Sequence, residues 1–174
     1  MKNLGKISVI VLFLLSIFVG SFTVYSISKV QSYGTLINYL GIVRGATQRL
    51  VKLELQQQPH DELIAYIDDI IYDLKNADGK YSLEKIPNVD YQQQFSALNT
   101  LWHRVKSNIY AVRQNPANSP LLLQSSEVHF EIANNTVFTA DNYTTSKSHQ
   151  LHFFLLNAGR HHYHVDRLIY GVPA

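Results

Sequence analysis

The feature that most constrains this chain is a long stretch near its start in which no residue is charged. Every residue from Ile7 to Ser28 is uncharged, and ISVIVLFLLSIFVGSFTV at positions 7–24 is rich in Ile, Val, Leu and Phe. As a helix, the uncharged stretch is about 33 Å long, which matches the roughly 30 Å hydrocarbon core of a bilayer. We therefore expect residues 1–28 to form a cytoplasmic N-terminus and a transmembrane anchor.

A cleavable signal peptide is the competing interpretation of this stretch. The apolar part of a signal peptide is usually only about 7–15 residues long, and a small-x-small cleavage site follows it. The stretch here is longer, and the best candidate site, around Gly20-Ser21, fits poorly. Lys2 and Lys6 precede it, so the positive-inside rule predicts a cytoplasmic N-terminus. The expected location is the inner (plasma) membrane, crossed once, with everything after Lys29 extracytoplasmic or periplasmic.

The charge balance of the remaining chain excludes several classes of protein. Residues 29–174 contain 13 Lys and Arg and 13 Asp and Glu, because two of the 15 basic residues are Lys2 and Lys6. Nucleic-acid-binding proteins need Lys and Arg clustered on one face, so no nucleic-acid partner is expected. The chain has no cysteine, which excludes disulfides, thiolate catalysis and cysteine-based metal sites.

Four helical patterns follow the uncharged stretch, at about residues 25–58, 61–77, 90–114 and 119–147. No segment alternates between apolar and polar residues with period two, so no strand is expected. The expected fold class is all-α, with the N-terminal transmembrane helix continuing into an antiparallel four-helix bundle over residues 29–147. The residues expected to end or begin these helices are Pro59, Asp61 as an N-cap, Asp78-Gly79, Asn115-Pro116 and Ser119-Pro120.

The spacing of apolar residues predicts which side chains form the core of this bundle. The third helix has the clearest repeat, in steps of three and four residues. The expected core residues are Tyr33, Leu36, Ile37, Leu40, Val43, Leu50 and Val51 from the first helix, Leu63, Ile64, Ile67, Ile70, Ile71 and Leu74 from the second, Phe95, Leu98, Trp102, Val105, Ile109 and Val112 from the third, and Leu123, Phe130, Ala133, Val137 and Ala140 from the fourth.

Residues 148–174 depart from the helical pattern and are predicted to form an irregular, histidine-rich tail. The last apolar run, LHFFLL at 151–156, is too short to cross a bilayer. His161 and His164 could share a metal ion if this segment were helical, but no carboxylate completes an HExxH frame. A solvated tail is favoured, and no metal or cofactor is expected.

One face of the first helix carries small and polar residues in place of apolar ones. At 100° per residue, this face lies opposite the expected core stripe, and Arg44 and Arg49 flank it. Each glycine costs about 1 kcal/mol relative to alanine within a helix, so three on one face indicate a packing or functional role. A solvated face that tolerates glycine is the alternative. The residues of this face are Gly34, Asn38, Gly41, Gly45, Gln48 and Lys52.

The same stretch resembles a known family of sensors. INYLGIVRGATQRL, at residues 37–50, resembles the periplasmic box of nitrate/nitrite sensor kinases, with the frame I-N-x-x-G-x-x-R-x-x-x-x-R-L. RGATQRLVKLEL and DELIAYIDDII are closer to the extracytoplasmic input domains of bacterial membrane-bound diguanylate cyclases, and SSEVHFEIANNTVFTADNY is similar to the fourth helix of those domains. The resemblance covers about residues 1–147.

The resemblance implies a transmembrane helix, a four-helix sensor, a second transmembrane helix and a cytoplasmic output domain. After residue 147 we expect neither of the last two, so the chain is expected to be a truncated or decayed member, or the input half alone, without the output domain. No GGDEF-type signature, kinase motif or phosphate-binding glycine loop occurs in the sequence. No catalytic residue can be assigned, and the protein is not expected to be an enzyme.

The resemblance also implies a ligand site. Arg44 matches the central arginine of the box, which implies a small anion bound where the first helices of a homodimer meet; Asn38, Gly41 and Gln48 are weaker candidate ligands. The alternative for Arg44 is an ion pair with an acid of the second helix, such as Asp69 or Asp73. The expected function is therefore ligand sensing in membrane signal transduction. A membrane-tethered helical scaffold that binds another protein and no small molecule is the second hypothesis.

Overall fold

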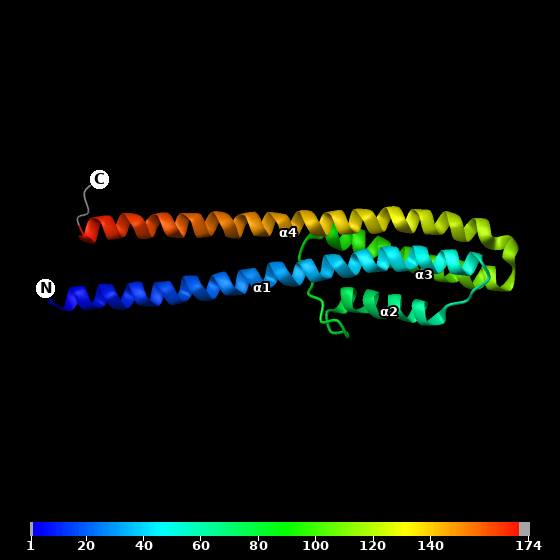
Figure 1. The fold of residues 1–174 in the computed structure, drawn as a ribbon, viewed down its shortest axis with the longest axis horizontal. Helices are drawn as coiled ribbons and strands as arrows, with labels where there is room; N and C mark the ends of the chain where they lie inside the picture. The colour runs from blue at the N-terminus through cyan, green and yellow to red at the C-terminus, as the bar shows by residue number, and fades with distance from the viewer. Residues whose placement is uncertain (1, 171–174) are drawn as a thin grey trace. The chain divides into compact units, whose positions relative to one another are not determined.

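A computed structural model describes residues 2–170 of the chain, and describes side chains for residues 5–157. The described chain is helical throughout, apart from its connecting loops, and contains no strand, which confirms the expected all-α class (Figure 1). Its helices are α1 (Lys2–Leu55), α2 (Asp61–Asn76), α3 (Val89–Gln114) and α4 (Ser119–Tyr170), with a short 3-10 helix η1 (Pro116–Asn118) before α4.

The chain forms two compact units, each built from separate parts of the sequence. One unit is Ser32–Thr144, which holds the second half of α1, all of α2 and α3, and the first part of α4. The other contains the chain up to Gln31 together with the chain from Thr145 onward. The two units are described separately below.

The Ser32–Thr144 unit has one hydrophobic core, to which all four helices and the α2–α3 loop contribute. All six core residues expected from the third helix are buried, and Trp102 and Val105 are fully enclosed. In α1 and α2 the expected residues are also buried, except that Ile37 and Leu63 are only partly covered. The loop adds Leu83 and Ile86, which are buried although no helical pattern marks them.

The core face of α4 differs from the expected one. Leu123 and Phe130 were expected to be buried, but they are 47% and 37% exposed. Val137 is partly buried, while Ala133 and Ala140 are buried as expected. The buried stripe keeps Ala133 and Ala140 but has Leu122, His129 and Thr136 where Leu123, Phe130 and Val137 were expected, so a search for large apolar residues misses half of it. Its members are Leu122, Ser126, His129, Ala133, Thr136 and Ala140.

The ends of α2 are built by side chains that sequence analysis assigned differently. His60, and not Asp61, is the N-cap: its Nδ1 accepts a hydrogen bond of 3.3 Å from the Leu63 backbone N–H. Ala77, with φ of 60°, closes the C-terminal end in the left-handed conformation that often ends helices. The helix therefore ends at Asn76, just before the expected Asp78-Gly79 stop.

The loop after α2 folds around a buried carboxylate, Asp73. Its two oxygens accept hydrogen bonds from the backbone N–H groups of Gly79, Tyr81 and Leu83. A Cβ at Gly79 would lie 2.7 Å from the Asp73 Cβ, so only glycine lets the loop approach this closely. Asp73 is thus fully used by its own loop.

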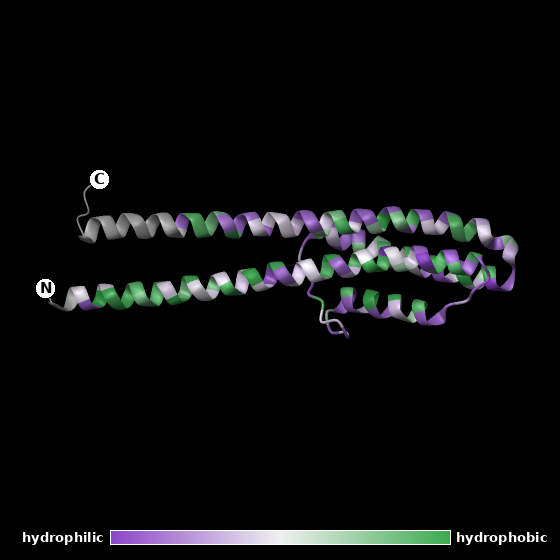
Figure 2. Cartoon of the chain, viewed as in Figure 1, coloured by the Kyte–Doolittle hydropathy of each residue, from purple (hydrophilic) through white to green (hydrophobic). Residues whose placement is uncertain are grey.

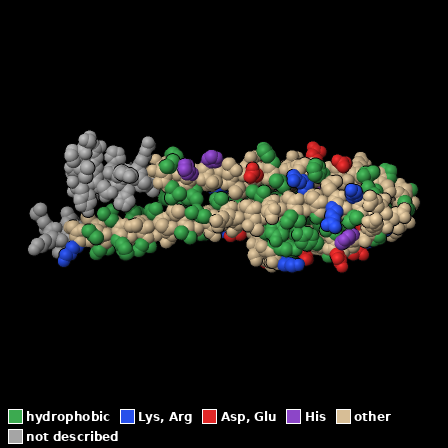
Figure 3. Space-filling model, in the orientation of Figure 1, with side chains coloured by type: hydrophobic (Ala, Val, Ile, Leu, Met, Phe, Trp, Pro, Cys, Tyr) green, Lys and Arg blue, Asp and Glu red, His purple; other side chains and the backbone are tan. Residues whose placement is uncertain are grey.

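The second unit contains the apolar start of α1. Its hydrophobic side chains, such as Phe13 and Phe18, are largely exposed, and the helix is long and apolar enough to cross a membrane (Figures 2 and 3). Two polar side chains in this stretch bond to their own helix, since Ser16 Oγ and Thr23 Oγ1 each donate to the carbonyl four residues earlier at 2.8 Å. Such bonding suits a helix in an apolar environment.

The expected irregular tail is wrong over most of its length. α4 continues as a helix to Tyr170, well past the expected end at Lys147. Helix-forming residues such as Leu, Ala and Arg occur through this region, and neither proline nor a pair of glycines interrupts it before Tyr170. The side chains of His161 and His164, and residues 171–174, lie outside the described part of the structure.

Candidate functional site

Arg44 is half-buried on the side of α1 that faces α4. Its Nη1 donates a 2.7 Å hydrogen bond to the side-chain oxygen of Asn134, and its guanidinium lies 5.9 Å from the centre of the Phe130 ring. None of the ion pairs between described residues involves Arg44. The alternative of an ion pair with Asp69 or Asp73 is therefore not found, and Asp73 is occupied by the α2–α3 loop.

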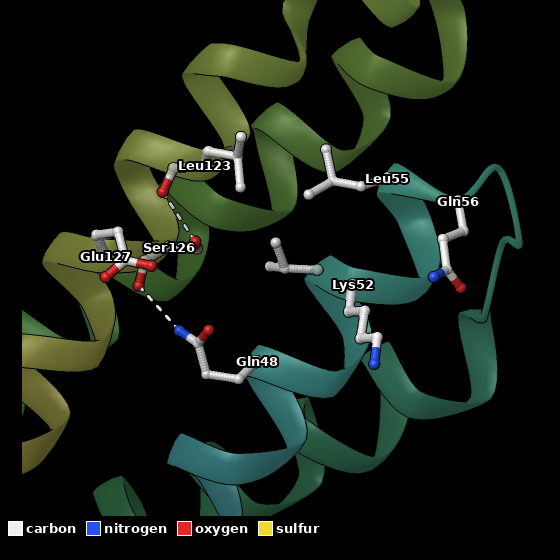
Figure 4. Close-up of a pocket in the computed structure, with 8 residues that line it drawn as sticks. Gln48, Lys52, Leu55, Gln56, Leu123, Ser126 and Glu127 are labelled. Carbon is white, nitrogen blue, oxygen red and sulfur yellow. Dashed lines mark hydrogen bonds between the residues drawn. The ribbon is translucent and has the colours of Figure 1, made fainter.

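Gln48 lies one helical turn beyond Arg44 and also reaches α4. Its Nε2 donates a 3.2 Å hydrogen bond to the backbone carbonyl of Ser126. Figure 4 shows this bond at one side of an open groove, which is lined by residues from the last turns of α1 and the first turns of α4. Two of the predicted site residues, Arg44 and Gln48, are therefore brought together at the α1–α4 contact.

The other two predicted ligands do not join them. Asn38 is exposed, and six residues of helix separate it from Arg44, which turns it about 120° around the helix axis. Gly41 has no side chain to offer, and a Cβ built on it would meet no other described part of the chain within 4 Å, apart from the adjacent residues and nearby backbone of its own helix. The same holds for Gly34 and Gly45. These glycines are consequently not required for packing within their own chain.

Sequence analysis missed the residues of α4 that complete the site. Ser126, Phe130 and Asn134 are spaced four residues apart, so they lie along one side of α4. Phe130 had been placed in the core, and Asn134 had no assigned role. Their four-residue spacing places them on one side of α4, but only the pairing of α1 with α4 shows that this side faces Arg44.

The contacts described for the Arg44 guanidinium are with an amide and an aromatic ring, and none of the ion pairs of the described residues uses it. Arginine has five N–H donors, and the Asn134 amide uses one of them. The remaining donors can hold a planar or tetrahedral oxyanion in a bidentate manner. Glu127 lies beside Gln48 and is the one acid among the residues that line the groove. Among the described residues no group of three His, Asp or Glu side chains is arranged to hold a metal ion.

A second arginine shows what a purely structural ion pair looks like in this unit. Arg113 of α3 binds Glu54 of α1 through two bonds of 2.8 and 2.6 Å, and its Nη1 binds Asp61 at 2.7 Å. The hydrogen bonds to Glu54 raise the pKa of Arg113. Since Glu54 is buried and also accepts from the His60 backbone N–H, this cluster joins α1, α2 and α3, and its arginine is already paired with two carboxylates.

His129 is the one buried histidine among the described residues, and it is fully enclosed. Neither ring nitrogen has a hydrogen-bond partner within the described chain, and its ring centre lies 6.3 Å from that of Trp102. Burial lowers the pKa of His129 to about 4, so the ring is neutral at ordinary pH. This side chain weakens the contact of α4 with the core.

Comparison with known proteins gives no match to a family model, a curated protein or a solved structure.

Proposed function

We propose that this protein is an extracytoplasmic sensory input module that binds a small anion at Arg44. In this proposal, α1 crosses the inner membrane with its N-terminus in the cytoplasm, and residues 32–144 form an antiparallel four-helix bundle outside. The contacts between α1 and α4 support that arrangement, because Tyr33 contacts Tyr143 while Gln48 contacts Ser126. Residue numbers therefore rise along one helix as they fall along the other.

The observation that carries the proposal is the neutral surrounding of a half-buried arginine. A guanidinium whose neighbours are an amide and an aromatic ring keeps its charge and most of its donors available. An anion bound there would contact α1 directly and α4 through Asn134 and Phe130. Binding would then favour one arrangement of α1 against α4, which is what a sensor needs in order to report its ligand.

A homodimer along the glycine face of α1 belongs to the same proposal. Glycine at positions 34, 41 and 45 costs helix stability and gains nothing inside the chain, since the space beyond each is open. Small residues on an exposed helix face allow a second helix to approach closely. A two-fold axis at this face would bring the two copies of Arg44 toward one another, and an anion would relieve their repulsion.

The test is thermal unfolding of the full chain in detergent, with and without nitrate and other small oxyanions. Ligand at about 100 times its Kd should stabilise the folded protein by about 2.7 kcal/mol, which raises the Tm by several degrees. Arg44→Ala should abolish this shift, whereas Arg49→Ala, which removes an exposed arginine of the same helix, should retain it. An equal shift in both variants would overturn the anion site.

The dimer is tested separately by measuring the mass of the full chain in detergent. Gly41→Leu should weaken dimerisation because its side chain fills the open face, while Gly41→Ala controls for the change in helix propensity. If Gly41→Leu dimerises normally and Arg44→Ala keeps its anion response, the second hypothesis, a helical scaffold without a small-molecule ligand, replaces this proposal.

A further inference from the structure

The open groove beside Gln48 continues the surroundings of the Arg44 guanidinium along α1. Arg44, Gln48, Val51 and Leu55 follow one another in steps of four, three and four residues, so they lie along one side of the helix. The last three of these residues line the groove. A molecule held by Arg44 can therefore extend along α1 into the groove without turning around the helix.

The facing side of α4 carries a matching apolar line. Phe130, whose ring centre lies 5.9 Å from the Arg44 guanidinium, is 37% exposed. Leu123, which lines the groove, is seven residues earlier and therefore about two turns away on the same side of α4. The hydrogen bonds of Arg44 and Gln48 to α4 show that earlier residues of α4 lie beside later residues of α1. The two helices thus present the Arg44 site and the groove in the same order.

The groove is small, and its centre is apolar. Its volume is about 320 Å³, at the lower end of the roughly 300–1,000 Å³ of typical ligand sites. Leu55 and Leu123 face each other across it in Figure 4, and the buried residue Val51 also lines it. Lys52 and Glu127 line it as well, and their opposite charges leave the groove without net charge. The groove therefore suits an uncharged, apolar group.

The spacing of the two features sets the length of a ligand that uses both. Arg44 and Val51 are seven residues apart, which corresponds to about 10.5 Å along the helix axis. With C–C bonds of about 1.5 Å, an extended carbon chain covers this distance in roughly eight bonds. A nitrate ion, by contrast, is long enough to occupy only the guanidinium.

We propose that the Arg44 site takes an aliphatic monocarboxylate of about eight carbons. The carboxylate accepts hydrogen bonds from the guanidinium donors that Asn134 leaves unused, in the bidentate geometry that arginine favours. The carbon chain lies in the groove between Leu55 and Leu123, where its apolar surface is removed from water. This inference rests on the anion site proposed above and names the class of ligand that the site binds.

The chemistry of the groove disfavours two related classes of ligand. A dicarboxylate of the same length would place its second charge against Leu55 and Leu123, at a cost in desolvation. A neutral molecule of the same length would fill the groove but leave the positive charge of Arg44 without a counter-charge. A neutral amide of the same chain length is therefore a suitable control.

Thermal unfolding of the full chain in detergent measures this preference. Octanoate and acetate share the carboxylate and differ by six methylenes, and octanamide has the octanoate chain without the charge. A fully buried methylene strengthens binding by roughly fourfold, and in an open groove we expect roughly twofold. Octanoate should therefore produce the same rise in Tm as acetate at on the order of 50-fold lower concentration. Octanamide should produce little rise.

Two leucines of α4 provide a matched pair of variants. Leu123 lines the groove and is 47% exposed, while Leu121 is 53% exposed and lies outside the set of residues that line it. Leu123→Ser should reduce the preference for octanoate over acetate several-fold, whereas Leu121→Ser should keep the wild-type preference. Arg44→Ala should lose the response to both carboxylates.

Equal potency of acetate and octanoate, with both responses lost in Arg44→Ala, would overturn this inference and leave the anion site intact. The inference would also be wrong if octanamide matched octanoate, or if the two leucine variants reduced the preference equally. If octanoate stabilised Arg44→Ala as well as the wild type, or if neither carboxylate raised the Tm of the wild type, the anion site itself would be contradicted.

Discussion

α3 and α4 line the same core with very different side chains. The core face of α3 consists of large apolar residues, whereas the face of α4 includes two alanines, a serine, a threonine and a histidine without hydrogen-bond partners. Stabilisation from burial grows with apolar area, at about 25 cal/mol per Å². Both helices contact the core, but α3 buries far more apolar surface than α4 and is therefore attached more strongly.

The polar contacts also attach α3 more strongly than α4 to the other helices. α3 is fastened by the Arg113–Glu54 ion pair and by hydrogen bonds from Trp102 and Lys106 to Asp68. In α4, the hydroxyls of Ser126 and Thr136 bond to carbonyls of their own helix. Those bonds do not attach α4 to its neighbours, whereas hydrogen bonds from Arg44 and Gln48 of α1 and from Asn108 of α3 do. Since one of these attachments is the Arg44–Asn134 bond itself, α4 is the helix that a ligand at Arg44 could move.

The largest expected effect comes from removing the central side chain of α3. Trp102→Ala should destabilise the protein by about 3–5 kcal/mol, because it leaves a cavity and removes the hydrogen bond to Asp68. Phe130→Ala, the matched aromatic deletion on α4, should cost much less because that ring is 37% exposed. Denaturant unfolding in detergent measures both. Equal losses would mean that the two helices are attached equally.

Acid should weaken the contact of α4 selectively. The folded pKa of His129 is about 4, below the ordinary value near 6.5, so the unfolded chain takes up a proton more readily. The free energy of unfolding is highest above about pH 6.5, where the ring is neutral in both the folded and the unfolded chain. It falls by on the order of 3 kcal/mol as the pH drops toward 4. Unfolding measured across this range should show the loss in the wild type. Replacing His103, an exposed histidine of α3, should leave the loss in place.

Replacing His129 itself is expected to raise the stability of the protein, by less than the losses described above. His129→Leu substitutes an apolar side chain of similar size for a ring whose two nitrogens are buried without partners. The variant should be more stable at neutral pH by about 1–2 kcal/mol and should lose part of the acid sensitivity. A destabilised variant would show that the ring has a bonding partner, such as a buried water, and that α4 is held more firmly than argued above.

The sequence was sufficient to predict the all-helical class and the core of α3, but not the length or the core of α4. In α3 the large residues Phe95, Trp102 and Ile109 repeat with the helical period and all are buried. In α4 the large residues Leu123 and Phe130 repeat with the same period and are exposed. Periodicity shows that a face is regular, but it cannot show which face turns inward when small side chains fit the available space.

The same limit applied to the site. Arg44 and Gln48 could be selected from α1 alone, since both lie on one side of that helix. Asn134 and Phe130 could be selected only after the pairing of α1 with α4 was known, because nothing local to α4 marks them as neighbours of an arginine. Asn38 was selected from the motif and lies on a different side of the helix.

Hydrogen exchange of the backbone amides is the most direct test of the central claim, that α4 is a weakly attached helix controlled by an anion at Arg44. In the full chain in detergent, amides of α4 between Ser126 and Thr136 should exchange faster than those of α3 between Leu98 and Ile109, since local opening follows local stability. Saturating nitrate should slow the α4 amides, leave those of α3 unchanged and have no effect in Arg44→Ala. Equal protection of the two helices, or α4 exchange that ignores the anion, would contradict the account.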